Sequence, residues 1–157
     1  MAKKKESKKF TTIINRKAEY EYQFSGHFEA GMMLTGTEVK SVRAGHTNLK
    51  EAFCFMQRGE LFIRNMYIGE YKFGAHNNHE PRRVRKLLLK KAELKKLDRK
   101  VKEKGFTIVP YKLYLSERGF IKLEVVLAQG KRQYDKRNTI KDRQNKRDLD
   151  RIKKMNL

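Results

Sequence analysis

Two runs of alternating apolar and polar residues near the carboxyl end constrain the fold most. In the segments FTIVPYKLYL, residues 106–115, and IKLEVVLA, residues 121–128, apolar residues recur at every second position, and a short turn around Gly119 separates the runs. Neighbouring side chains of a strand point to opposite faces, so this alternation predicts an antiparallel hairpin with one buried face. The residues expected to face inward are Val109, Tyr111, Leu113 and Leu115, and then Ile121, Leu123, Val125 and Leu127.

Two further segments predict strands. Apolar, aromatic-rich runs flank a turn at Gly59 within residues 51–68, which is typical of a second hairpin. Tyr20, Tyr22 and Phe24 alternate with polar residues as in a half-buried strand, with residues 28–34 as its continuation. Strands joined by short turns favour a mainly β fold, a small antiparallel OB-fold-like barrel with short flanking helices.

The pattern predicts two such helices. Thr35 and Glu38 have the spacing of a capping box, and Gly45 can end a helix of about two turns. Lys40 and Arg43 would share one face of that helix, where they could contact neighbouring phosphates. The second helix is amphipathic and precedes a glycine; its apolar positions are Leu94, Leu97 and Val101, and the glycine is Gly105.

The two ends of the chain lack the apolar periodicity of a core. We expect a flexible basic arm over residues 1–14, one barrel domain over residues 15–130, and a basic tail over residues 131–157 that is disordered in the free protein. The formal net charge of the 157 residues is +21, more than solubility requires. A polyanion is therefore the expected partner.

Several classes of function lack a signal in the sequence. No run approaches the roughly 20 apolar residues of a membrane-spanning helix, and no apolar stretch follows the basic start, so neither membrane insertion nor secretion is expected. The only cysteine, Cys54, is typical of a buried strand residue, which fits a reducing cytoplasm. No catalytic motif appears, and the histidines, interpreted as polar loop residues, lack the paired half-motifs of a zinc site. We expect no enzyme activity, cofactor or metal.

Residues 69–91, GEYKFGAHNNHEPRRVRKLLLKK, combine aromatic, amide and basic side chains. Arginine pairs with phosphates in a fixed geometry, and aromatic rings stack on exposed bases, so this composition favours RNA binding. The cations could equally form a solvated face, Tyr71 and Phe73 could belong to the core, and residues 87–89 are expected in the core. The basic residues concerned are Arg82, Arg83, Arg85 and Lys86.

Five blocks together resemble one family. NRKA at residues 15–18, FEAG at 28–31, GTEVKSVRAG at 36–45, HEPRRVRKLLL at 79–89 and GKRQYDKR at 130–137 are similar to the SsrA-binding protein (small protein B, SmpB) family, although Lys90 stands where that family commonly has histidine. The resemblance implies an OB-fold-like barrel and a bacterial, non-enzymatic role in trans-translation. The implied partner is the tRNA-like domain of transfer-messenger RNA (tmRNA), one protein per RNA, with alanyl-tRNA synthetase and elongation factor Tu as indirect partners.

The resemblance also implies a set of RNA-facing residues. It comprises Asn15, Arg16, Lys17, Glu29, Gly36, Glu38, Lys40, Arg43, Arg83, Arg85, Lys86 and Lys122, with Leu88 interpreted as packing. A glutamate does not favour contact with phosphate, so Glu29 and Glu38 must read a base or sugar hydroxyl, orient an arginine, or cap a helix. For Glu38 we favour capping, because Thr35 precedes it by three residues.

In the same family the tail enters the ribosome, mainly its small subunit. The resemblance places Gly130, Lys131, Tyr134, Asp135, Lys136 and Arg137 near the decoding centre, and Leu149 and Ile152 on an induced helix in the empty mRNA channel. Phosphates around the tail would relieve repulsion among its cations and couple folding to the channel. The alternatives from other classes are a structural ribosomal or other rRNA-binding protein, and an RNA-processing enzyme, for which no catalytic group is found.

Overall fold

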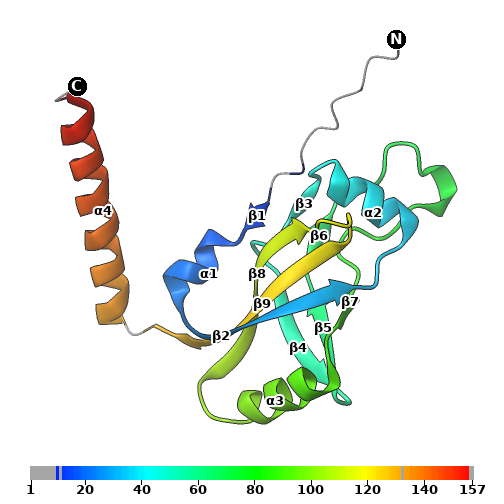
Figure 1. The fold of residues 1–157 in the computed structure, drawn as a ribbon. Coiled ribbons are helices and arrows are strands. Elements are labelled where there is room, and N and C mark those ends of the chain that lie inside the picture. Colours follow the sequence, from blue (N-terminus) through cyan, green and yellow to red (C-terminus); the bar gives the residue numbers. More distant parts are fainter. Residues whose placement is uncertain (1–9, 11, 132, 156–157) are drawn as a thin grey trace.

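The chain folds around a closed antiparallel β-barrel. The structure, a computed structural model, describes residues 10, 12–131 and 133–155, without the side chains of residues 132–136. Six strands form a ring in the order β8-β4-β5-β7-β2-β9, closed by the β8–β9 pair, and β1 pairs with β8 beside it (Figure 1). The strands of this sheet are β1 (Ile13–Ile14), β2 (Tyr22–Met32), β4 (Phe53–Gln57), β5 (Glu60–Arg64), β7 (Arg85–Leu88), β8 (Phe106–Leu115) and β9 (Ile121–Gly130).

Short helices flank the barrel, a longer helix, α4, extends away from it, and a small second sheet lies beside it. The helices are α1 (Arg16–Glu21), α2 (Gly36–Arg43), α3 (Lys91–Val101), the 3-10 turn η1 (Ala75–Asn77) and α4 (Gln133–Met155), and the second sheet pairs β3 (Thr47–Asn48) with β6 (Tyr67–Ile68). Figure 1 shows α2 and α3 at opposite ends of the barrel. Leu97 of α3 and Val42 of α2 are fully buried and belong to one core with the inward residues of the strands. The predicted barrel with short helices is confirmed.

Both predicted hairpins are present, and their turns contain glycine. Arg58 and Gly59 between β4 and β5 both have positive φ, at 51° and 74°, which suits the right-handed twist of the flanking strands. Gly119 between β8 and β9 has φ of 84°. The predicted helices are also present: the Thr35 hydroxyl accepts a hydrogen bond from the Glu38 amide at the start of α2, and Leu97 is the buried centre of α3.

The prediction of which β8 side chains face inward is wrong for Val109 and Tyr111, which lie next to a bulge at Pro110. The register with β9 shifts between Pro110 and Lys112, and a one-residue slip moves the following side chains to the opposite face. Leu113 and Ile108 therefore face the barrel interior, whereas Val109 and Tyr111 join a smaller outer cluster under α1.

The segment before β2 is a helix, not the strand predicted around Tyr20. Asn15 caps α1 by accepting from the Ala18 amide, and Ala18 buries its methyl group in the outer cluster. Of the three aromatic residues, only Tyr22 and Phe24 lie in β2, which continues through Phe28 to Met32 as expected. Order also begins before residue 15, because Ile13 pairs with Leu113 of β8; residues 1–9 and 11 of the expected arm lie outside the described residues.

Helix α4 extends away from the barrel (Figure 1), where the sequence predicts disorder in the free protein. Its described side chains are almost all exposed, so its helical form depends on local terms such as helix propensity and the Arg151–Asp148 pair. Just before α4, Lys131 Nζ donates to the Glu19 carbonyl, and at the middle of the helix Arg143 lies 4.0 Å from the Glu19 carboxylate. That helix formation depends on the ribosome stays a prediction. Among the described helices, none has the length and apolar character to cross a membrane.

Candidate RNA-binding surface

The exposed face of α2 holds two cations in place. Arg43 Nη2 donates to the Gly119 carbonyl of the β8–β9 turn at 3.3 Å, and Lys40 Nζ lies 4.9 Å from the centre of the Tyr71 ring. Both side chains belong to exposed residues and keep further donors free for a ligand. Gly36, at the start of the helix, has open space where a Cβ would stand. Among the described residues, this face therefore presents exposed positive charge.

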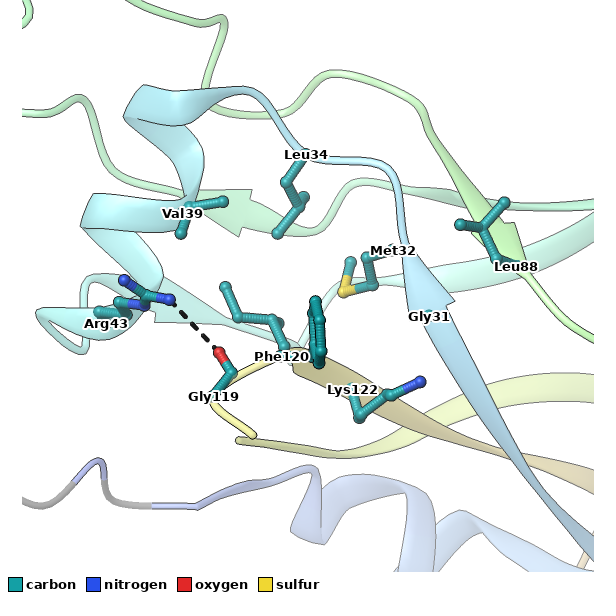
Figure 2. Close-up of a pocket in the computed structure, with 10 residues that line it drawn as sticks. Gly31, Met32, Leu34, Val39, Arg43, Leu88, Gly119, Phe120 and Lys122 are labelled. Atoms are coloured by element: carbon teal, nitrogen blue, oxygen red, sulfur yellow. Dashed lines mark hydrogen bonds between the residues drawn. The ribbon is translucent and has the colours of Figure 1, made fainter. Parts of the chain in front are cut away.

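A hollow of about 360 Å³ lies beside α2 (Figure 2). Arg43 stands on one side and Lys122 on another, with the Phe120 ring between them. Phe120 is 63% exposed and Leu88 is 47% exposed, so the expectation that Leu88 belongs to the core is wrong. The lining residues are Gly31, Met32, Leu34, Val39, Arg43, Leu88, Gly119, Phe120, Ile121 and Lys122. The hollow therefore joins an apolar floor to a cationic rim.

A second hollow continues past Leu88 and carries an acidic group. Glu29 of β2 lines it with Leu88, Leu89, Lys90, Glu93 and Lys122. The Glu29 carboxylate lies 3.8 Å from Lys122 Nζ. Burial and a hydrogen bond to Glu29 raise the pKa of Tyr114 to about 12, so the phenol remains protonated at neutral pH. Of the three roles weighed for Glu29, its geometry favours orienting a cation or accepting from a hydroxyl.

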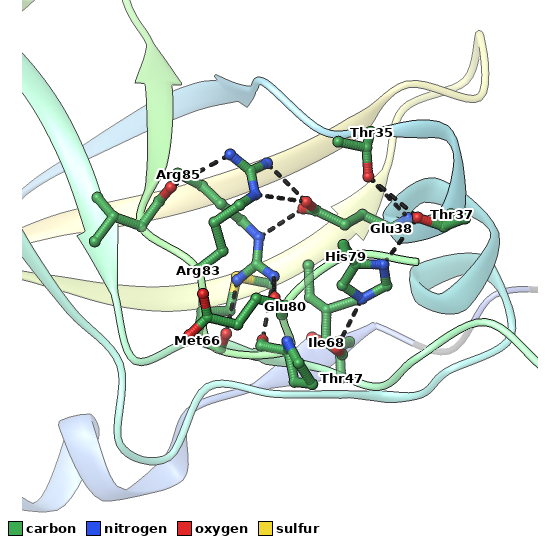
Figure 3. Close-up of polar contacts among 12 residues, drawn as sticks. Thr35, Thr37, Glu38, Thr47, Met66, Ile68, His79, Glu80, Arg83 and Arg85 are labelled. Atoms are coloured by element: carbon green, nitrogen blue, oxygen red, sulfur yellow. Dashed lines mark hydrogen bonds and ion pairs between the residues drawn. The ribbon is translucent and has the colours of Figure 1, made fainter. Parts of the chain in front are cut away.

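Glu38 lies in a buried ion network, which corrects its predicted capping role (Figure 3). Its Oε1 accepts from Arg83 Nε at 2.8 Å and Nη2 at 2.7 Å, and its Oε2 accepts from Arg85 Nε at 2.6 Å. Arg85 also donates to the Met66 carbonyl. Burial lowers the pKa of Arg85, and Glu38 opposes that shift. Glu38 thus orients two arginines, the second of the roles considered.

Only one of these arginines can reach a ligand. The Arg83 side chain is 38% exposed, whereas the Arg85 side chain is 0% exposed. A buried guanidinium cannot contact an RNA phosphate without leaving the core, so Arg85 is a structural residue here. Strand alternation in β7 explains the difference from the prediction, because Arg85 and Leu87 point inward while Lys86 and Leu88 point outward.

The amino-terminal part of the predicted set lies in a different place. Arg16 and Lys17 are exposed on α1 and line a separate hollow with residues 13–15 and 47–50. Asn15 is buried, and its amide donates to the Pro110 carbonyl, so its role is to attach α1 to β8. Lys86 pairs with Glu60 across β5 and β7. The structure therefore does not bring the whole set to one surface.

Two of the histidines differ from their interpretation as polar loop residues, His27 by lying in a strand and His79 by its burial. His27 lies in β2 and pairs with Glu124. His79 is buried, its Nε2 donates to the Ile68 carbonyl, and its Nδ1 is 2.9 Å from the Thr37 hydroxyl, so it connects the loop before β7 to α2. Within the described part of the chain, no three His, Cys, Asp or Glu side chains are grouped as metal ligands. Cys54 is buried as expected, and burial raises the pKa of its thiol.

The predicted ribosome-facing residues begin at the end of β9. Gly130 pairs with Tyr22, and Lys131 is half-buried against α1. The side chains of Tyr134, Asp135 and Lys136 lie outside the described residues, and Arg137 is exposed. Farther along α4, a row of apolar side chains at spacings of three is 55–85% exposed: Leu149, Ile152 and Met155. Nothing in the described barrel covers this row.

Sequence reasoning missed Phe120 and left the environment of Phe73 open between an RNA-binding loop and the core. Phe120 follows Gly119 in the β8–β9 turn, and the exposed aromatic beside a turn glycine was the available signal. Phe73 is 76% exposed, so the possibility that it belongs to the core is excluded.

Comparison with known proteins gives one consistent result. A family model described as SmpB protein matches residues 12–155. The SsrA-binding protein of Flavobacterium psychrophilum is 53% identical over 146 residues, covering 93% of this chain and 97% of that protein. The SsrA-binding protein of Phocaeicola vulgatus is 49% identical, covering 89% and 93%. A solved chain described under "tmRNA-SmpB: a journey to the center of the bacterial ribosome" has a TM-score of 0.65 and 44% identity, covering 82% of this chain and 94% of that one.

Proposed function

The chain belongs to the SmpB family, and on that premise we propose that it binds tmRNA and acts with it on bacterial ribosomes in trans-translation. The observation that carries the proposal is the grouping of Arg43, Lys122 and Leu88 around the hollow beside α2. These residues come from three separate elements and were all named by the family resemblance. The solved relative described with tmRNA and the ribosome supports the same partners.

The surface suits a folded RNA that exposes both backbone and base edges. Lys40, Arg43 and Lys122 supply donors for phosphates, while the apolar floor can contact sugars and base faces. Glu29 can accept from a ribose hydroxyl, a group that distinguishes RNA from DNA. We therefore assign the α2 surface to the tRNA-like domain of tmRNA, with Arg83 held at its margin by Glu38.

The protein works by binding rather than by catalysis in this proposal. One protein on the tRNA-like domain would support alanylation by alanyl-tRNA synthetase and delivery with elongation factor Tu. The α4 end would then occupy the decoding centre and the mRNA channel beyond it. Support for the second role comes from the uncovered row that includes Leu149 and Ile152, and from the basic residues on the rest of the helix.

The salt dependence of RNA binding tests the α2 surface. Replacing both Lys40 and Arg43 by Ala should reduce the slope of log affinity against log salt by about 0.7 to 0.9 for each phosphate that the variant no longer neutralises. The matched control is Lys95→Ala with Arg99→Ala, which removes two exposed cations from α3 at the other end of the barrel. Both variants and the natural protein would be titrated with the tRNA-like domain at several salt concentrations. Equal slopes for the two double variants would reject Lys40 and Arg43 as phosphate ligands.

A further inference from the structure

The loop between β6 and β7 presents an aromatic side chain to solvent. Phe73 is 76% exposed, one of the most exposed apolar residues outside α4. Single exposed apolar side chains are common and carry no meaning by themselves. The exposure of Phe73 becomes informative because specific contacts fix the conformation of the residues around it.

The Asn78 side chain joins two parts of the loop by hydrogen bonds to the backbone of Tyr71. Its Oδ1 accepts from the Tyr71 amide at 3.0 Å, and its Nδ2 donates to the Tyr71 carbonyl at 2.8 Å. Gly74 packs so closely that an added Cβ would lie 2.8 Å from Asn78 Nδ2. The next residue, Ala75, has a φ of +44°, a backbone conformation that residues with side chains adopt only under constraint. The buried His79 then attaches the loop to α2.

A cation and a second aromatic ring lie beside the Phe73 ring. Lys72 Nζ lies 5.7 Å from the centre of the Phe73 ring, and the Tyr71 ring contacts Phe73 edge-on at 5.7 Å between centres. Tyr71 in turn lies under Lys40, which belongs to the proposed RNA surface on α2. The ring is therefore next to groups that can hold a phosphate chain, and it is held before any ligand arrives.

We propose that Phe73 stacks on an unpaired base of the RNA that α2 binds, and that the Asn78 contacts hold the ring in position for it. This proposal rests on the RNA-binding function and extends the RNA surface from α2 to the β6–β7 loop. Stacking on an aromatic ring needs a base that has left the helical stack, so the expected ligand is a loop or bulge nucleotide rather than a paired one.

Fluorescence can test the stacking directly because the chain contains no tryptophan. Phe73→Trp introduces a single reporter, and Gln57→Trp at the exposed tip of the β4–β5 hairpin, away from the β6–β7 loop, is its control. Each full-length variant would be titrated with the tRNA-like domain of tmRNA and with a fully paired RNA duplex of equal length. The Trp at 73 should be quenched by the tRNA-like domain at the concentrations that give binding by filter retention, and should remain bright with the duplex.

Affinity gives the second measurement. Phe73→Leu should weaken binding of the tRNA-like domain by about 5- to 150-fold, the range that one stacked base supplies, whereas Phe73→Tyr should bind nearly as the natural protein does. On the duplex, Phe73→Leu should have no effect. The side chain is exposed, so these substitutions should leave the fold intact.

A double-variant cycle tests the role of Asn78. Asn78→Ala should weaken binding when Phe73 is present and cost little more when Phe73 is already Leu, because a loosened loop then has no ring to position. Additive losses would show that Asn78 acts elsewhere.

Unchanged affinity of Phe73→Leu, or an unquenched Trp at 73 on saturated protein, would overturn the stacking. Failure of the natural protein to bind the tRNA-like domain would instead reject the proposed function itself.

Discussion

The barrel and α4 are both rich in cations, yet they hold them differently. In the barrel, Arg83 and Arg85 share one buried carboxylate, and Lys40 lies over an aromatic ring. In α4, the described cations are exposed, and their contacts are surface pairs such as Arg151 with Asp148. Long-range contacts therefore preform the barrel surface, whereas the helix of the tail is supported mainly by local terms, besides the contact of Arg143 with Glu19. The first region suits a fixed RNA shape, and the second suits a partner that surrounds it.

The largest effect is expected from the buried carboxylate. Glu38→Gln leaves Arg85 as a buried charge without its counterion, so the free energy of unfolding should fall by about 3–5 kcal/mol. Urea unfolding followed by circular dichroism measures it. The counterpart in α4 is Asp148→Asn, which breaks an exposed pair and should change stability by less than about 0.5 kcal/mol. Similar losses of unfolding free energy for the two variants would contradict the difference inferred between the preformed barrel surface and α4.

A smaller effect, confined to α4, is expected from Leu149→Pro. Proline in a helix interior costs about 3 kcal/mol and changes no charge here, so it separates folding of the tail from its electrostatics. Alanine transfer from tmRNA on ribosomes without downstream message should be abolished, while affinity for tmRNA and the urea midpoint of the barrel stay unchanged. Leu149→Ala, which keeps the helix, is the control for removal of the leucine side chain. Full transfer by the proline variant would reject the helical tail model.

The smallest effect on stability is expected from removing the tail altogether. Deletion of residues 132–157 retains Lys131 and its contact with Glu19, so the free energy of unfolding should fall by less than about 1 kcal/mol. Affinity for tmRNA should also be nearly intact, although rescue of stalled ribosomes should fail. Thermal unfolding and filter retention provide the two measurements. A larger loss of stability would mean that α4 packs on the barrel more extensively than the Arg143–Glu19 contact indicates.

Local patterns predicted local structure well. The hairpin turns at Gly59 and Gly119 and the helix start at Thr35 are determined by residues close together in sequence, and all three are confirmed. The bulge at Pro110 was not predictable in the same way, because it depends on which residue of β9 lies opposite. The helix α1 was missed because its capping side chain, Asn15, is held from β8 by the Pro110 carbonyl.

In the candidate site, too, the sequence did not predict features that depend on residues distant in the chain. Lys40, Arg43 and Lys122 were named from the sequence and lie near one hollow or its margin. Arg83 and Arg85 look equivalent in sequence, yet one is partly exposed and the other is buried, because Arg85 occupies an inward position of β7 whereas Arg83 lies before that strand begins. No periodicity in a run of basic residues reveals a single carboxylate 45 or 47 positions away. Buried partners of this kind appear only with the tertiary structure.

The pairing of β2 with β9 has a consequence for how the protein is made. Phe28 lies opposite Val125, so a strand near the start of the chain depends on one near the end of the barrel. Because about 100 residues separate these partners and a ribosome adds about 5–20 residues per second, β2 lacks β9 for on the order of 5–20 s during synthesis. A message broken before the codons of β9 would yield a chain in which β2 lacks its β9 partner, so that this edge of β2 is open to aggregation. A message broken within α4 would still encode every strand of the barrel.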